Sequence, residues 1–159
     1  MTRSIAITVA SLNATATAVL IMSLFSCSGT RPSNLGVKDA RLAPCPSSPN
    51  CVSSDDADTG HRIAAFQLAV PAGEAWRAAR SAVGGLARTK IITDTDDYLH
   101  AECSSAFFGF VDDLELHLRA ADHLIAVRSA ARLGQGDFGV NRKRVEDLRS
   151  SLRHQGIIR

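Results

Sequence analysis

The chain has 159 residues, of which 45% are hydrophobic and 21% charged, with a formal net charge of +2 and four cysteines. This length suits one ordinary domain preceded by a targeting segment. The near-neutral charge argues against a nucleic-acid partner, because such proteins carry a strong basic excess.

The N-terminus has the layout of a secretory signal. Arg3 is its single charge, and the uncharged stretch that follows contains the apolar run AVLIMSLF. The stretch ends in LFSC (24–27), which resembles a bacterial lipobox, where the cysteine is lipidated and becomes the mature N-terminus. An uncleaved membrane anchor and plain secretion are the alternatives. We expect a signal peptide over residues 1–26 and a lipid such as palmitate on Cys27, which places a lipoprotein in the cell envelope, facing the periplasm or the exterior.

Cys45 and Cys51 lie in the proline-bounded stretch RLAPCPSSPNCVSS. A structural zinc site usually has two close cysteine pairs, and a redox Cys-x-x-Cys motif is absent here. Since an exported chain meets an oxidising compartment, a local disulfide is the leading interpretation of this pair. Residues 27–60 are rich in Pro, Ser and Gly, so we expect them to form a tether that contains this loop.

Residues 61–159 are expected to form the folded domain. Apolar residues alternate with small or polar ones over 66–70, which predicts a strand. Between Pro71 and Gly84, apolar side chains at helical spacing predict a helix. Strands are predicted over 90–93, 98–104, 111–119 and 123–129. A glycine-rich loop then precedes a last helix, for which Asn141 is the expected N-cap.

The predicted order of elements is β-α-β-β-β-β-α. Consecutive strands with short links indicate an antiparallel sheet of about five strands, and two amphipathic helices can cover one of its faces. The sequence therefore predicts a two-layer α+β domain that resembles helix-grip domains. Cys103 alternates with Leu99 and Ala101 along one strand, so we expect it to be a buried and unreactive thiol.

Four motifs follow one another between residues 29 and 156: GTRPSNLGV, CPSSPNCVSS, YLHAECSSAFFGFVDDLEL and VRSAARLGQGDFGVNRKRVEDLR. Together they resemble the bacterial and plastid family of domains of unknown function that is numbered 1499. The family pattern usually has a second serine where this chain has Ala131. The resemblance implies a domain, but it implies no reaction or ligand.

Acidic and basic residues are segregated within the domain. Eight carboxylates and one base lie between Thr93 and Asp122, whereas eight bases and three carboxylates lie between Arg128 and Arg159. We expect the two blocks to face each other and neutralise internally. The candidate residues for a ligand-binding or structural polar network are Asp112, Asp113, Glu115, Arg128, Ser129, Arg132, Asp137, Asn141, Arg142 and Arg144.

Two functional hypotheses follow from these patterns. The first is a non-enzymatic lipoprotein, held at the membrane by its lipid, that binds an envelope protein or a small ligand through the sheet face and the loop before the last helix. The alternative is a small hydrolase-like or metal-dependent enzyme that uses Asp113, Glu115 and His117. His and Glu on a solvated sheet face are commoner than a metal site, so no catalytic residue, metal or cofactor is assigned.

Overall fold

The computed structural model describes residues 28–159, so the predicted signal peptide and the predicted lipidation site at Cys27 lie outside the described residues. The described chain is an α+β domain with two helices and an antiparallel sheet, as predicted. The sheet has six strands, where about five were predicted, because β3 from the N-terminal segment joins it. In chain order the elements are β1 (Val37–Lys38), β2 (Arg41–Leu42), β3 (Cys51–Ser53), β4 (Phe66–Gln67), α2 (Ala72–Gly84), β5 (Thr89–Asp94), β6 (Tyr98–Ser104), β7 (Val111–Arg119), β8 (Leu124–Ala131) and α3 (Val140–His154).

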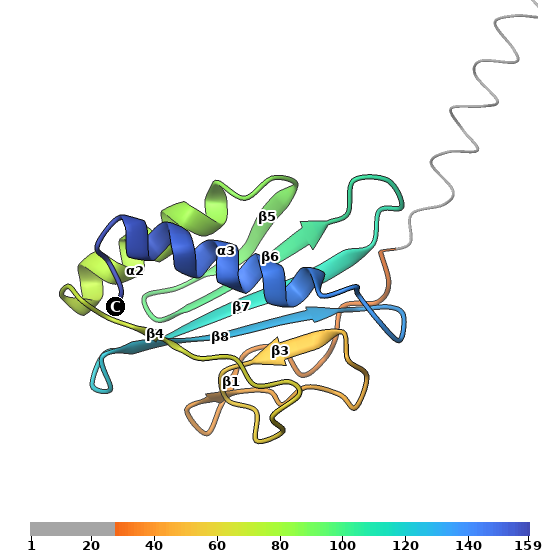
Figure 1. Cartoon of the computed structure of the whole chain (residues 1–159), viewed down its shortest axis with the longest axis horizontal. Coiled ribbons are helices and arrows are strands. Elements are labelled where there is room, and N and C mark those ends of the chain that lie inside the picture. The colour runs from red at the N-terminus through yellow and green to blue at the C-terminus, as the bar shows by residue number, and fades with distance from the viewer. Residues whose placement is uncertain (1–27) are drawn as a thin grey trace, which may run out of the picture.

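The sheet has the strand order β3-β8-β7-β6-β5, and β4 pairs with β8 on the same edge as β3. Side chains alternate between the two faces along each strand. Leu99, Leu116 and Val127 lie side by side in the ladder of β6, β7 and β8 and are fully buried. The core therefore forms on the face of the sheet that the two helices cover (Figure 1).

The two helices bury the apolar stripes that the sequence predicts. In α2 the buried residues include Trp76, Ala79 and Val83, and the helix ends at Gly84 as expected. The indole N–H of Trp76 donates to the carbonyl oxygen of Thr95 at 3.1 Å, so this buried ring has a polar partner. The 66–70 strand is shorter than predicted, because the residues after β4 pair with the buried C-terminal tail instead, through the bridge between Leu68 and Ile158.

Asn141 is not the N-cap of α3, so that prediction was wrong. The N-cap is Gly139, whose φ of 76° lies in the left-handed region that glycine adopts readily. The carboxylate of Asp137 accepts the backbone N–H groups of Gly139 and Asn141 at 3.0 and 2.8 Å. The Asn141 side chain points inward and is fully buried, because it hydrogen-bonds to residues of the sheet and the N-terminal segment.

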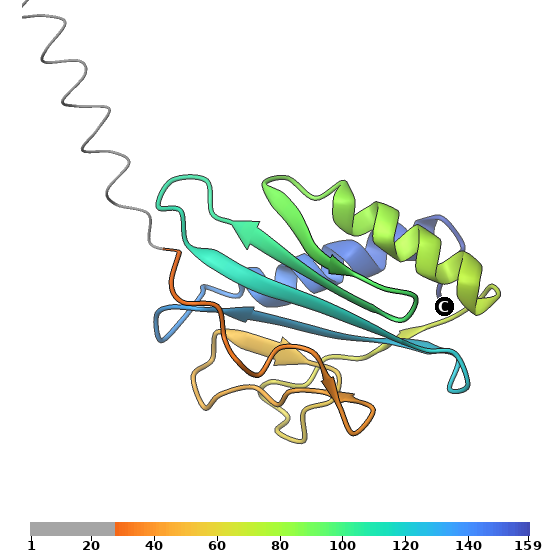
Figure 2. The same ribbon diagram turned by 180° about the vertical axis from the view of Figure 1, so that it is seen from behind.

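Residues 28–60 are part of the fold and do not form the expected tether. The part before β3 runs along the face of the sheet away from the helices (Figure 2), where Arg31 and Gly36 contact side chains of the sheet and β1 pairs with β2. β3 itself joins the edge of the sheet by pairing with β8. The disulfide between Cys45 and Cys51 is present, as predicted. The composition of residues 28–60 led to the wrong prediction, because a proline- and serine-rich segment can form either a linker or an irregular coil that packs on a sheet.

Candidate functional site: a buried polar layer and a pocket

A layer of charged and polar side chains lies between the sheet and the N-terminal segment, on the face opposite the helices. Its centre is Glu115, which is completely buried. The carboxylate of Glu115 accepts hydrogen bonds from the Tyr98 hydroxyl at 2.8 Å, the backbone N–H of Gly36 at 2.8 Å and a guanidinium N–H of Arg128 at 2.9 Å. Burial, together with the neighbouring negative charge of Glu115, raises the pKa of Tyr98, so this hydroxyl stays protonated and donates.

A second part of the layer is organised by Arg132. Its guanidinium donates to both carboxylate oxygens of Asp113, at 2.6 and 2.8 Å, and to Glu102 at 2.6 Å. The imidazole Nε2 of His100 lies 2.7 Å from the same Asp113 carboxylate, and Arg31 of the N-terminal segment reaches Glu102 at 2.6 Å. The hydrogen bond from Arg132 is the main reason that the pKa of Glu102 lies below its usual value. Burial opposes ionisation of Asp113, but Arg132 and His100 outweigh it and lower its pKa.

His117 and Arg119 close the layer near the end of β7. Arg119 pairs with the carboxylate of Asp55 and also donates through Nε to Nδ1 of His117 at 3.3 Å. The same Asp55 carboxylate accepts the backbone N–H of Leu42 at 2.9 Å, which fastens β2 to the sheet. Burial and the positive charge of Arg119 lower the pKa of His117, so its ring is held neutral with Nδ1 as an acceptor.

The polar layer confirms that the acidic and basic blocks face each other. Asp113 and Glu102 pair with Arg132, Glu115 pairs with Arg128, and a further pair on the helix side joins Asp112 to Arg144. The layer lies under residues 28–60, so this sheet face is not a free surface. Its charged groups are held in mutual pairs, which is a structural arrangement.

The three residues of the enzymatic hypothesis do not share an open site. Asp113 is paired with Arg132 and His100, Glu115 with Arg128 and Tyr98, and His117 with Arg119, and all three are buried. Within residues 28–159, no group of three His, Cys, Asp or Glu side chains is placed to hold a metal ion. The geometry therefore gives the enzymatic hypothesis no specific support.

A second polar cluster lies on the helix side, where α3 meets β7 and β8. The guanidinium of Arg144 donates to Asp112 at 2.7 Å, to the Asn141 side-chain oxygen at 2.6 Å and to the Ser129 hydroxyl at 3.0 Å. The Asn141 amide in turn donates to the Asp137 carboxylate at 2.8 Å. This cluster ties the loop before α3 to the sheet.

The ten candidate residues thus divide into separate groups. Asp113, Glu115, Arg128 and Arg132 belong to the polar layer, and Asp112, Ser129, Asp137, Asn141 and Arg144 to the cluster below α3. Arg142 belongs to neither, because its guanidinium donates to the backbone carbonyls of Gly60 and Arg62. The sheet separates the two groups, so they do not form one binding site.

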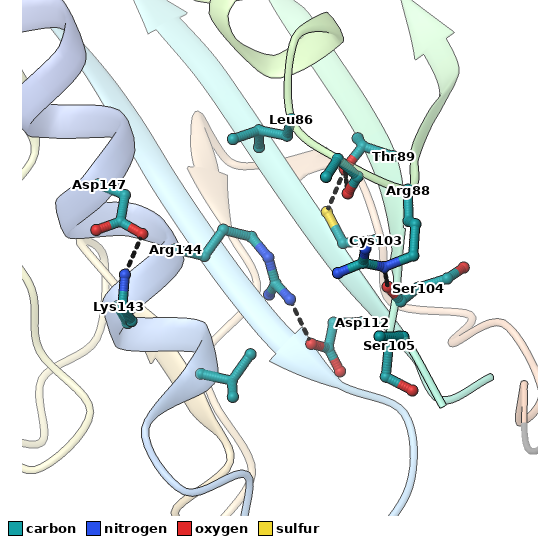
Figure 3. A pocket seen from close by; sticks show the side chains of 13 residues that line it. Leu86, Arg88, Thr89, Cys103, Ser104, Ser105, Asp112, Lys143, Arg144 and Asp147 are labelled. Carbon is teal, nitrogen blue, oxygen red and sulfur yellow. Dashed lines mark hydrogen bonds and ion pairs between the residues drawn. The ribbon is translucent and has the colours of Figure 1, made fainter. Parts of the chain in front are cut away.

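A pocket of about 370 Å³ opens beside the second cluster, between the first turns of α3 and the neighbouring ends of β5 and β6 (Figure 3). Its charged lining residues are Arg88, Lys143, Arg144, Asp112 and Asp147. Lys143 pairs with Asp147 at 2.6 Å and Arg144 pairs with Asp112. Within residues 28–159 Arg88 forms no ion pair, and its Nε donates to the carbonyl oxygen of Ser104 at 3.2 Å. The pocket therefore carries one more positive than negative side chain.

Two further features distinguish the pocket walls. Arg88 has a φ of 53°, in the left-handed region that a residue with a side chain adopts at a cost of about 1 kcal/mol. Cys103 lines the pocket as a buried thiol whose pKa is raised by burial, and the Thr89 hydroxyl lies 3.4 Å from its sulfur. A raised pKa keeps the thiol protonated and unreactive, which agrees with the sequence expectation.

Sequence analysis did not single out Arg88, Lys143 or Asp147. Arg88 lies just before β5, whereas Lys143 and Asp147 lie in α3 within the last of the four family motifs, so only the fold brings the three together. The pocket combines an apolar wall with an excess cation only because the fold brings separate segments together, so no local sequence signal predicts it.

Fold and site together define a two-layer α+β domain in which two helices cover one sheet face and the N-terminal segment covers the other. Its pocket carries one more cationic than anionic side chain. Neither described helix is long and apolar enough to cross a bilayer. Residues 41–152 match the family model described as protein of unknown function (DUF1499), and the chain belongs to this family. No curated protein and no solved structure matched the chain.

Proposed function

We propose that the protein is a membrane-tethered lipoprotein of the cell envelope, anchored through Cys27, whose domain binds a small anionic ligand in the pocket between α3 and the ends of β5 and β6. The observation that carries the ligand assignment is the charge balance of the pocket, with three cationic side chains against two carboxylates. The pocket lies on the helix side, so binding through the opposite sheet face is not part of the proposal.

Export and tethering are supported by two features of the chain. The apolar run that ends in LFSC (24–27) is typical of a lipoprotein signal. The disulfide between Cys45 and Cys51 is a bond that persists in an oxidising compartment and is rare in the cytosol. Both features agree with a domain that faces the periplasm or the exterior.

The ligand class follows from the lining of the pocket. Leu86, Cys103 and Val140 provide apolar wall, while Arg88 and Lys143 provide cationic groups at its rim. Ligand sites usually combine an apolar wall with a few polar groups that orient the ligand. A phosphate or carboxylate group attached to a short apolar chain fits this combination, and the volume of about 370 Å³ suits a small molecule.

Calorimetric titration with hexyl phosphate and inorganic phosphate tests the ligand assignment. We expect hexyl phosphate to bind more tightly than inorganic phosphate, because only the former uses the apolar wall. The Arg88→Gln substitution removes a charged donor that contributes about 1.4 kcal/mol or more, so affinity should fall about tenfold. Arg77→Gln is the matched control, since Arg77 is an exposed arginine of α2 outside the pocket lining. Equal affinity in the two variants would contradict the assignment.

Intact-mass analysis of the chain extracted from membranes tests the tether. We expect a chain that begins at Cys27 and carries added lipid mass, and we expect Cys27→Ala to remain an unmodified precursor. A chain that retains residues 1–26 without lipid would refute the lipoprotein assignment.

A further inference from the structure

Six of the seven exposed large apolar side chains among residues 28–159 lie at one end of the domain. Phe107, Phe108 and Phe110 lie in the loop between β6 and β7, and Phe107 is 92% exposed. Leu133, Phe138 and Val140 lie in the loop before α3 or begin that helix. We call these six residues the apolar end. Patches of this kind on a soluble domain mark a surface that meets a partner or a membrane.

The two loops of the apolar end are ordered neighbours. The backbone N–H of Ser105 donates to the carbonyl oxygen of Phe110 at 2.8 Å, which closes the first loop on itself. The backbone N–H of Arg132 donates to the carbonyl oxygen of Val111 at 3.2 Å, which joins the start of the second loop to the base of the first. The aromatic rings are therefore held outward by a fixed backbone.

The described chain begins at this same end. In Figures 1 and 2 residue 28, the loop between β6 and β7 and the loop between β8 and α3 all lie at one end of the molecule, far from the C-terminus. Contact is direct, because a side chain at Gly29 would meet Cβ of Arg132 and Cγ of Leu133 at 3.0 Å each. Arg31 is fixed by its ion pair with Glu102. No slack tether therefore separates residue 28 from the apolar end.

From these observations we infer that the apolar end docks on the surface of the lipid bilayer to which the N-terminus is attached. This inference rests on the proposed membrane tether. One residue of extended chain spans about 3.5 Å, so an anchor at Cys27 brings Gly29 and the adjoining loops to the headgroup region. Aromatic side chains at that depth exchange contact with water for contact with lipid, which stabilises the docked orientation.

The distribution of charge supports the same orientation. The pocket beside the apolar end has one cation in excess, Arg88, and this charge is attracted to an anionic membrane surface. The exposed carboxylates of Asp96, Asp97 and Asp122 lie in the hairpin turns at the opposite end of the sheet and are repelled by it (Figure 1). Docking on lipid therefore places the pocket beside the headgroups and the acidic turns away from the membrane.

Tryptophan quenching by brominated lipid tests the docking. The full chain, with its own N-terminal attachment, is reconstituted in vesicles of phosphatidylcholine with a minor share of phosphatidylglycerol, with and without brominated acyl chains. We expect brominated lipid to quench the emission added by Phe108→Trp. Ala121→Trp, in the exposed turn at the opposite end, is the matched control and should not be quenched. Trp76 is buried in the core in both variants and provides the common background.

The outcomes separate the docking from the tether when the intact mass of the same preparation is measured. A chain with lipid on Cys27 and quenching confined to Phe108→Trp supports both. If the chain carries lipid but the two variants are quenched equally, or not at all, the docking is overturned and the tether stands. This result is expected if the apolar end binds a protein instead of lipid. A chain without lipid that shows the selective quenching supports the docking and overturns the lipid anchor. A chain that shows neither lipid on Cys27 nor selective quenching overturns both the tether and the docking.

Discussion

Replacing Glu115 with alanine is the sharpest test of the polar layer as a structural element. The substitution removes the acceptor for the hydroxyl of Tyr98, the backbone N–H of Gly36 and the guanidinium of Arg128, all within 2.9 Å. Arg128 is 97% buried, and its Nε already has no partner within residues 28–159, so the change leaves a buried cation without its counter-ion. Breaking a buried ion pair from one side costs about 3–5 kcal/mol, and we expect about 4 kcal/mol here. This is a large share of a typical domain stability.

Urea unfolding, followed by the fluorescence of the single and buried Trp76, measures this loss. With a denaturant slope of about 2 kcal/mol per molar urea, the midpoint should fall by about 2 M. Glu115→Gln keeps an oxygen acceptor but not the charge, so its effect should be smaller. Asp147→Ala is the matched control, because that carboxylate is 58% exposed in its pair with the exposed Lys143 and such surface pairs contribute about 0–1 kcal/mol. Equal midpoints for Glu115→Ala and Asp147→Ala would refute the structural role.

Three further predictions concern pH, a close backbone contact and the disulfide. Burial and Arg119 hold the folded pKa of His117 below the unfolded value of 6.5, so the stability that its neutral form contributes is complete above that value. This stability is lost as pH falls through the folded pKa, and His117→Gln should therefore flatten the stability profile below about pH 6.5. Gly29→Ala should lower the free energy of unfolding by at least about 1 kcal/mol, because the φ is 64° and the new Cβ has no room, whereas Gly73→Ala has room in α2 and should not destabilise. Replacing both Cys45 and Cys51 with serine should lower stability by about 2 kcal/mol in urea, and a reduced wild-type chain should match the double variant.

Residues that belong to regular elements could be predicted well from sequence. The strands at 98–104 and 111–119 were placed to the residue, since apolar side chains alternate there with charged ones over seven and nine positions. Alternation does not reveal what covers the charged face of the sheet. We expected solvated His and Glu side chains, but His100 and Glu115 are buried, because a polar segment from far earlier in the chain covers them.

The features missed by sequence analysis depend on long-range placement. Arg31 and Glu102 are 71 positions apart, so their pairing has no local signal, and the packing of residues 28–60 was hidden by their linker-like composition. The sequence favours core positions for Phe107 and Phe108, because phenylalanine is usually buried, but that expectation was wrong and both side chains are exposed. The pocket arises where the ends of three elements meet, which only the fold determines.

Amide chemical-shift mapping by NMR during titration of the chain with hexyl phosphate shows whether the domain binds a small anionic ligand at this pocket. We expect saturable shifts at the backbone amides of Thr89, Ser104 and Lys143, which line the pocket, and unchanged signals in the turn at Ala121. Shifts that are absent at saturating hexyl phosphate, or that fall mainly outside the pocket lining, would contradict this binding.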